Sequence, residues 1–231
     1  LHDDVVTLQR LVRVFNNLRV PQALSVAAAR VQAFVGDVWR LMPPNPYHNF
    51  SHVADVTQCI YTLLVSSGLA ARLDGTLVAA AVLAALCDDL EHPGLSNVWQ
   101  NNEATEISRR DQGESPLERH HCAVFDALVD RHQLLAKLTT SKHDLVLRVV
   151  RRMILATDMA NHNQLMSAVR ERVERGRGAG LGGRGIVKTK REERKRVSRF
   201  QISTSISRQL LRVILQFALT FLAHTDTFLF L

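Results

Sequence analysis

The sequence predicts an all-α fold, and three features of the chain support this prediction. Apolar residues recur at helical spacing through most of residues 5–169, which places them on one face of successive helices. Strand-like alternation of apolar and polar residues is scarce in the same range. The 231 residues are 46% hydrophobic and 22% charged, a composition typical of a globular chain that buries a core rather than of a disordered one.

Prolines, glycines and capping residues set the boundaries of the predicted helices. The first two helices follow the apolar residues from Val5 to Phe15 and from Val31 to Met42, and Pro43 stops the second. The helices predicted after these lie, in order, over about residues 47–67, 73–90, 97–102, 116–139 and 142–174.

The start of the helix predicted at residue 116 carries a capping pattern. Ser115 is the predicted N-cap, Pro116 suits the first turn, and Glu118 occupies the capping-box position. We therefore expect Ser115 and Glu118 to bind backbone N–H groups at this helix end. We interpret His120 and His121, further along the helix, as structural residues.

A basic segment divides the chain into three predicted parts. Residues 170–199 contain 12 Lys and Arg and 4 Asp and Glu, a net charge of +8, so the rest of the chain carries −1 of the total +7. We predict a helical core over 1–173, a Gly/Arg-rich linker or insert over 174–205 and an apolar helix over 206–231. For 170–199 we favour a solvated loop over a phosphate-binding arm for nucleic acid or anionic lipid, because no aromatic residues interleave the arginines.

The cysteine content and the apolar segments predict a cytoplasmic protein. Cys59, Cys87 and Cys122 are too few for a disulfide framework and lie in apolar, helix-like contexts, as expected of buried thiols in a reducing compartment. The N-terminus lacks the pattern of a secretory signal. The apolar run Leu210–Ala223 contains Arg212 and is shorter than the roughly 20 residues that span a bilayer, so we expect no transmembrane segment.

Two short stretches place metal-ligand residue types about one helical turn apart. His48 and His52, at positions i and i+4, are expected on one helix face, and Asp88, Asp89 and His92 converge at the end of an apolar helix. Buried carboxylates there are costly unless a cation neutralises them. Imidazole with carboxylate suits zinc, and carboxylate with water suits magnesium or manganese. An incidental histidine pair and a solvated helix end explain the same residues without a metal, and spacing alone leaves both interpretations open.

Four motifs together resemble, in their order and spacing, the catalytic domain of class I 3′,5′-cyclic nucleotide phosphodiesterases. They are NPYHNFSHVADVTQ, AALCDDLEHPGLSN, SPLERHHCAVF and ILATDMANH, and the resemblance covers about residues 8–169. The last two motifs look most similar to the high-affinity cGMP-specific subgroup. The resemblance implies a helical bundle of the HD superfamily that opens cGMP or cAMP to the 5′-monophosphate in signal transduction.

The resemblance also assigns roles to individual residues. It implies that His48 is the general acid that protonates the departing 3′ oxygen, and that His52, Asp88 and Asp89 are metal ligands. The implied cofactors are two divalent ions, zinc and magnesium or manganese. The residues that it places around the metal waters or in the substrate pocket are Tyr47, His92, Glu106, Thr157 and Asp158.

Three departures from the family pattern support an alternative. Asp88 stands where the family has a histidine, which shifts the site toward harder metals. Thr220 occupies the position of the family's fourth ligand, and the nearest carboxylate is Asp226. The sequence ends at Leu231, before the family's purine-reading glutamine, so the resemblance is to a C-terminally incomplete domain. The alternative is a truncated or degenerate domain without activity that acts as a binding or interaction module, and a homodimer is also left open.

Overall fold

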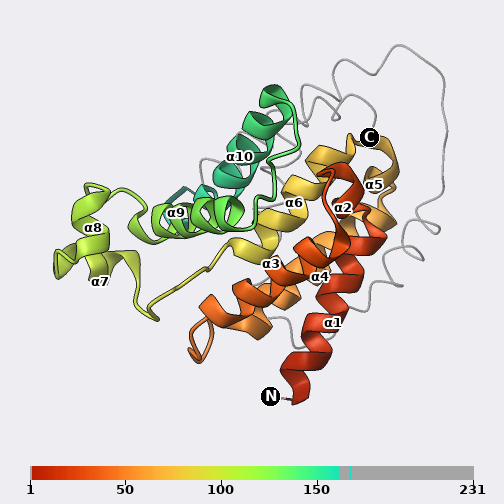
Figure 1. Cartoon of the computed structure of the whole chain (residues 1–231). Coiled ribbons are helices and arrows are strands. Elements are labelled where there is room, and N and C mark those ends of the chain that lie inside the picture. The colour runs from red at the N-terminus through yellow and green to blue at the C-terminus, as the bar shows by residue number, and fades with distance from the viewer. Residues whose placement is uncertain (1, 162–166, 168–231) are drawn as a thin grey trace, which may run out of the picture.

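A computed structural model of the chain describes residues 2–161 and residue 167, and in these residues the regular secondary structure is helical (Figure 1). The helices are, in chain order, α1 (His2–Asn17), α2 (Val20–Ala23), α3 (Ala28–Leu41), α4 (Phe50–Ser66), α5 (Leu69–Arg72), α6 (Gly75–Cys87), α7 (Asn97–Asn102), α8 (Glu106–Arg110), α9 (Pro116–Arg131) and α10 (Thr140–Leu155), followed by the 3-10 helix η1 (Met159–Asn161). The all-α prediction is confirmed for this part of the chain. None of its helices combines the length and the apolar character that a membrane span requires.

Helix α6 is the centre of the bundle. It packs against α2, α4, α9 and α10, and every residue from Val78 to Leu90 is buried. A helix that is apolar on all sides belongs in a core, and the alanines of α6 allow neighbouring helices to approach it closely. Helices α7 and α8 lie at the far end of the molecule from α1 and α5 (Figure 1). The connection from α6 to α7 therefore leads from the core to this end of the molecule (Figure 1).

Several predicted helices are shorter in the structure because side chains or left-handed residues end them. Helix α4 begins at Phe50 rather than near residue 47, because Asn49 is its N-cap and accepts a hydrogen bond from the backbone N–H of His52 at 3.0 Å. The prediction that His48 and His52 share a helix face is therefore wrong, since His48 lies in the loop before the helix. Helix α6 ends at Cys87 rather than Leu90.

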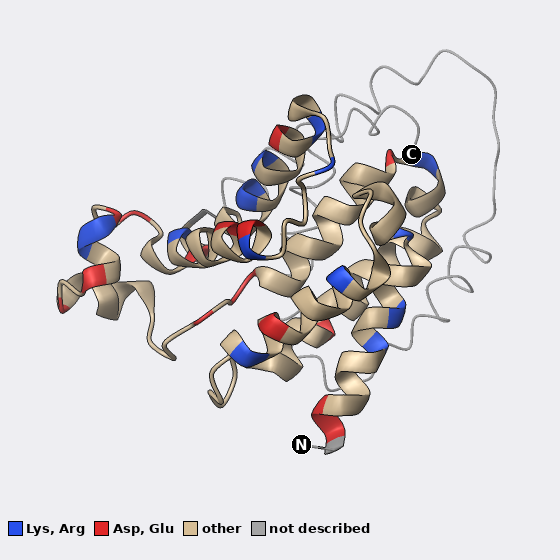
Figure 2. Ribbon diagram, in the orientation of Figure 1, with Lys and Arg blue, Asp and Glu red and all other residues tan. Residues whose placement is uncertain are grey.

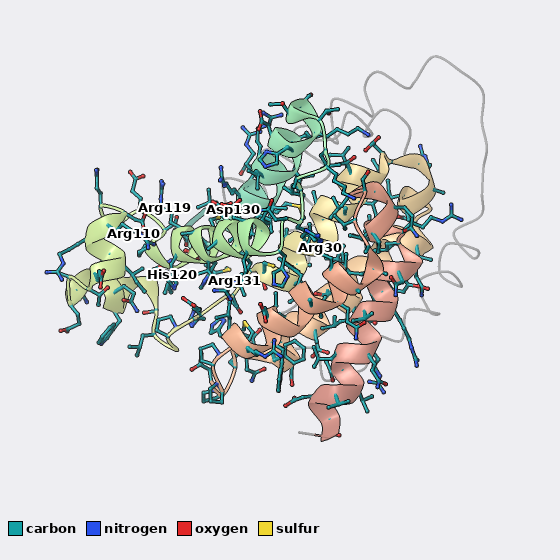
Figure 3. All side chains as sticks on the ribbon, in the orientation of Figure 1. Arg30, Arg110, Arg119, His120, Asp130 and Arg131 are labelled. Carbon is teal, nitrogen blue, oxygen red and sulfur yellow. The ribbon has the colours of Figure 1, made fainter. Side chains whose placement is uncertain are left out.

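The ends of α9 and α10 show how tertiary contacts stop a helix. Helix α9 ends at Arg131 rather than near 139, because Gln133 adopts φ 46° and the N–H of Leu134 returns to the carbonyl of Val129 at 3.0 Å. Arg30 of α3 holds this end by donating to the carbonyl of His132 at 2.9 Å, and Figure 3 shows Arg30 at this position.

Helix α10 ends at Leu155 rather than near residue 174. The hydroxyl of Thr157 donates to the carbonyl of Ile154 at 2.7 Å, and Asp158 Oδ1 accepts from the N–H of Ala160 at 2.9 Å, which starts a new turn. The helical periodicity continues past this point in the sequence, but the polar side chains of Thr157 and Asp158 bind backbone groups and end the helical hydrogen-bond pattern. The boundaries predicted at 174–205 and 206–231, the basic segment 170–199, and the candidate ligands Thr220 and Asp226 lie outside the described residues.

Candidate active site

One cavity of about 870 Å³ is lined by the predicted site residues that the structure describes, with the exception of Glu106. The loop before α4, the end of α6, the start of α9 and the turn after α10 form its walls. The predicted site residues that line it are Tyr47, His48, His52, Asp88, Asp89, His92, Thr157 and Asp158.

Asp89 joins the two metal-ligand stretches. His48 Nδ1 donates to Asp89 Oδ2 at 2.8 Å, and His52 Nε2 lies 3.3 Å from the same oxygen. Burial would raise the pKa of Asp89, but the hydrogen bond from His48 and the nearby imidazoles lower it to about 2. Burial likewise lowers the pKa of His48, yet the hydrogen bond and charge of Asp89 outweigh this effect and raise it overall. The geometry therefore favours an imidazolium at His48 beside a carboxylate at Asp89.

Asp88 lacks the compensation that Asp89 has. The residue is 2% exposed, and its Oδ1 has no hydrogen-bond partner within the described part of the chain. Burial, followed by the adjacent charge of Asp89, raises the pKa of Asp88 well above its usual range. A buried carboxylate without a partner is unfavourable, so this oxygen marks a position that suits a cation.

The imidazole ring of His92 packs against that of His48. The two rings are stacked with centroids 3.9 Å apart and planes inclined by 12°. The N–H of Gly94 donates to His92 Nδ1 at 2.9 Å, which assigns Nδ1 as an acceptor. Burial, with smaller contributions from the neighbouring imidazoles, lowers the pKa of His92 to about 4 despite the charge of Asp89. His92 is therefore a neutral partner for the charged ring of His48.

Asn45 ties together the two loops that carry these histidines. Its side-chain amide donates to the carbonyl of His48 at 3.0 Å and to the carbonyl of His92 at 2.7 Å. Gly94 packs against the side chain of Asn45. Its φ is 79°, and a Cβ atom at this position would lie 2.9 Å from Asn45 Oδ1. A larger residue than glycine is therefore disfavoured at position 94 both by its backbone angle and by this contact. Sequence reasoning missed Asn45, although it lies three residues before the first histidine of the motif.

The predicted capping pattern at α9 is replaced by contacts across the cavity. Ser115 adopts φ 43° and makes no side-chain cap; its hydroxyl donates to Asp158 Oδ2 at 2.6 Å instead. Asn97 supplies the cap, because its Oδ1 accepts from the N–H of Leu117 at 3.0 Å and its Nδ2 donates to Glu118 Oε2 at 2.9 Å. Both Ser115 and Glu118 therefore belong to the cavity wall rather than to a capping box.

Glu118, not Glu106, brings a further carboxylate to the cavity. Glu106 is exposed in the first turn of α8 and does not line the cavity, so the structure does not support its predicted role beside the metal waters. Burial raises the pKa of Glu118 to about 7, with help from the charges of Asp158 and Asp89 and against the hydrogen bond from Asn97. Its four-residue motif had suggested only helix capping, which explains why sequence reasoning missed it.

The two adjacent histidines of α9 differ in position. His121 lines the cavity: its Nδ1 donates to the carbonyl of Leu90 at 2.6 Å, and its Nε2 lies 4.0 Å from Asp89 Oδ1. His120 faces away from the cavity toward Glu91, 3.2 Å from its carboxylate, and Figure 3 shows it near Arg110. The interpretation of His121 as purely structural is therefore incomplete, because its ring is part of the cluster around Asp89.

The residues present fit a divalent cation. His52, Asp88 and Asp89 each offer a ligand atom within 4.8 Å of the others, and so do His48, Asp89 and His92. The partnerless oxygen of Asp88 and the shared carboxylate of Asp89 are the features that such an ion would satisfy. With a charged imidazole beside it, the cluster is suited to neutralise an anionic substrate and to transfer a proton to it.

These features define the class of protein: an all-α bundle of the HD type whose central helix ends in a cluster of histidines and acids that fits a divalent cation. The family model described as "3'5'-cyclic nucleotide phosphodiesterase" matches residues 47–219. The chain belongs to the 3′,5′-cyclic nucleotide phosphodiesterase family, and the resemblance found in the four motifs is confirmed.

Individual relatives include enzymes named for both cyclic nucleotides. The chain is 36% identical over 163 residues to the 3',5'-cyclic-nucleotide phosphodiesterase regA of Dictyostelium discoideum, covering 69% of this chain and 20% of that protein. It is 36% identical over 132 residues to the mouse high affinity cGMP-specific 3',5'-cyclic phosphodiesterase 9A, covering 56% of this chain and 25% of that protein. It is 38% identical over 138 residues to a probable 3',5'-cyclic-AMP phosphodiesterase, pde-4, of Caenorhabditis elegans, covering 59% and 20%. The chain thus spans between a fifth and a quarter of the length of these relatives.

The solved structures support the fold. The phosphodiesterase domain of the RhoPDE fusion protein from the choanoflagellate Salpingoeca rosetta matches with a TM-score of 0.72 and 24% sequence identity, covering 94% of this chain and 63% of that chain. At this level of identity the likeness shows the fold alone.

Proposed function

We propose that this chain hydrolyses a 3′,5′-cyclic nucleotide, cGMP or cAMP, to the 5′-monophosphate. The observation that carries the proposal is the convergence of His48, His52, Asp88, Asp89 and His92 on one cavity. Two of the relatives are named for cGMP and cAMP respectively, which supports the substrate class and leaves the choice of base to experiment.

His48 is the proposed general acid. Its Nδ1 is held by Asp89 Oδ2, so Nε2 is the ring nitrogen that donates the proton. In the reaction, water attacks phosphorus and releases one proton to solvent, the bond from phosphorus to O3′ breaks, and O3′ takes the proton from His48. The hydrogen bond and charge of Asp89 raise the pKa of His48, which favours the protonated ring, and the stacked ring of His92 keeps the imidazole oriented.

His52, Asp88 and Asp89 are the proposed metal ligands, and the ions that the family resemblance predicts are zinc and magnesium or manganese. When bound, divalent ions supply positive charge for the phosphoryl oxygens and acidify water, the nucleophile of the hydrolysis. Glu118 of α9 lines the same cavity, and its pKa of about 7 allows it to accept a hydrogen bond from water or donate one to water near neutral pH. Tyr47 packs edge-on against His48, with ring centroids 4.9 Å apart, and closes one side of the site. The free thiols of Cys59, Cys87 and Cys122 are consistent with the cytoplasm as the proposed compartment.

The test is a hydrolysis assay on the full chain with cGMP and cAMP in the presence of magnesium, manganese or zinc. We expect formation of the 5′-monophosphate, and we expect His48→Ala to lower kcat by about 100-fold or more, because it removes the proton donor. His143→Ala is the matched control, since His143 lies on α10 beside Asp144 and outside the cavity. Absence of hydrolysis in the wild type, or equal rates in wild type and His48→Ala, would contradict the proposal and favour the non-enzymatic alternative.

A further inference from the structure

Asp88 occupies the most demanding electrostatic position among the proposed ligands. It caps the C-terminal end of α6, where the helix dipole disfavours an anion. It is 2% exposed, its Oδ1 has no partner among the described residues, and the next residue, Asp89, is also an acid. The helix end therefore holds two adjacent buried carboxylates. Asp89 is surrounded by three imidazoles, whereas Oδ1 of Asp88 has no hydrogen-bond partner among the described residues.

The charged residues around the cavity do not compensate this pair. Among the described residues, Arg119 is the one Lys or Arg that lines the cavity, and Glu114 already holds its guanidinium, with contacts at 2.9 Å to the carbonyl and 3.2 Å to the carboxylate. The acidic residues that line the cavity are Asp88, Asp89, Glu114, Glu118 and Asp158. A bound cation is therefore the means by which Asp88 gains a counter-charge.

The donor atoms around Asp88 are rich in oxygen. His52 contributes one imidazole nitrogen, whereas Asp88 and Asp89 contribute carboxylate oxygens, all within 4.8 Å of one another. The nearby nitrogen of His48 is engaged by Asp89, and His92 Nδ1 is engaged by the N–H of Gly94. Carboxylate and water ligands suit manganese and magnesium, whereas imidazole and thiolate ligands suit zinc.

We propose that Asp88 sets the metal preference of this centre, shifting it from zinc toward the oxygen-preferring ions manganese and magnesium. This inference rests on the proposed function for the existence of the metal centre. Zinc binds a given set of ligands more tightly than manganese, so the effect of Asp88 is measured as a change in relative affinity rather than as exclusion of zinc.

The experiment compares the wild-type chain with Asp88→His and Asp88→Asn. Each protein is stripped with a chelator and titrated separately with manganese chloride and zinc chloride by calorimetry. We expect Asp88→His to change the ratio of the two dissociation constants in favour of zinc by about tenfold or more, because a neutral nitrogen replaces an anionic oxygen. We expect Asp88→Asn, which keeps the shape and removes the charge, to weaken manganese binding by about tenfold or more.

Asp130→His is the matched control, because it places a new histidine on the exposed side of α9 and outside the cavity (Figure 3). An unchanged ratio in Asp88→His, or a wild type that binds neither ion, would overturn the inference. If Asp88→His loses its helical circular dichroism and is therefore unfolded, the test rests on Asp88→Asn. Unchanged manganese binding in Asp88→Asn would then overturn the inference. The readout is binding, so a wild type that binds manganese without hydrolysing cyclic nucleotides supports this inference and contradicts only the proposed function.

Discussion

Asp89 shows how single residues of the site depend on one another. Its Oδ2 accepts from His48 and faces His52, whereas its Oδ1 faces His121. His121 is in turn oriented by the backbone, because its Nδ1 donates to the carbonyl of Leu90. A ligand whose position is set by second contacts binds a metal in a defined geometry, so residues such as Asn45 matter to the site without contacting substrate.

Glu118 provides a prediction about pH at this scale. Its folded-state pKa of about 7 lies above the ordinary 4.5, so its contribution to stability is fully present below pH 4.5 and is lost as the pH rises through 7. Glu118→Gln keeps the acceptor for Asn97 and removes the ionisation. The wild type should lose stability between pH 4.5 and pH 8, whereas Glu118→Gln should not. We therefore expect the free energy of unfolding of the variant, relative to that of the wild type, to rise by about 1–3 kcal/mol over this pH range. Urea unfolding of metal-free protein at both pH values measures this difference.

The same measurement has an internal control. At pH 4.5 the side chain at this position is largely neutral in both proteins, so their stabilities should be close, and the difference should appear only as the pH rises. A constant difference at all pH values would show that the Glu118→Gln substitution changes packing, and the assigned pKa shift would then be wrong.

At the scale of elements, α6 explains both the stability of the bundle and the place of the site. Ala84 and its alanine neighbours are fully buried where α4 and α10 pack against the helix. The same helix ends at Cys87 and delivers Asp88 and Asp89 directly into the cavity. A change in the spacing around α6 therefore affects the core and the proposed metal ligands together.

Ala84→Leu tests this close packing. Added methyl groups have no space at a fully buried alanine, so we expect a loss of about 1–3 kcal/mol in the free energy of unfolding. Ala71→Leu on α5 is the control, because Ala71 is exposed and its substitution should change stability by less than about 0.5 kcal/mol. Thermal or urea unfolding measures both, and equal effects of the two substitutions would contradict the close packing of α6.

For the whole molecule, the charge distribution separates the site from the basic segment. Figure 2 shows basic and acidic residues interspersed on the helices, with acidic residues and no basic ones on the connection from α6 to α7. The excess of positive charge resides in residues 170–199, outside the described part of the chain. An anionic substrate is therefore expected to depend on bound metal for its counter-charge rather than on a basic surface of the bundle.

Metal removal should consequently weaken the whole fold. His52 on α4 and Asp88 after α6 are both proposed ligands, so an ion held by them would join two elements and would bind only when these are folded together. At a free metal concentration of about 100 times Kd, binding adds about 2.7 kcal/mol, so chelation should remove a similar amount from the free energy of unfolding. Urea unfolding with manganese and with a chelator measures the effect. His52→Gln should abolish it, and an equal manganese effect in that variant would contradict the assignment of His52 as a ligand.

Local sequence patterns were sufficient to predict the helices and most of the site. Periodic apolar residues report one-sided burial of a helix, and this is a property of neighbouring positions, so α1 and α3 follow from the sequence. Helix α6 follows from its continuous apolar run, which is closed by Pro93 and Gly94. The histidines and acids of the motifs could be identified because their residue types and spacing are themselves the signal. The family resemblance then followed from four such motifs in order.

The sequence by itself therefore determined the fold class and the family of this protein, and it predicted the residues that are proposed as metal ligands. Only the tertiary structure decided that His48 lies in a loop, that α10 stops at Leu155, and that Glu118 and His121 join the cavity while Glu106 does not. These outcomes depend on contacts between residues far apart in the chain, such as Asn97 with Glu118 and Ser115 with Asp158. Local periodicity carries no information about such contacts, because they form only when the helices pack.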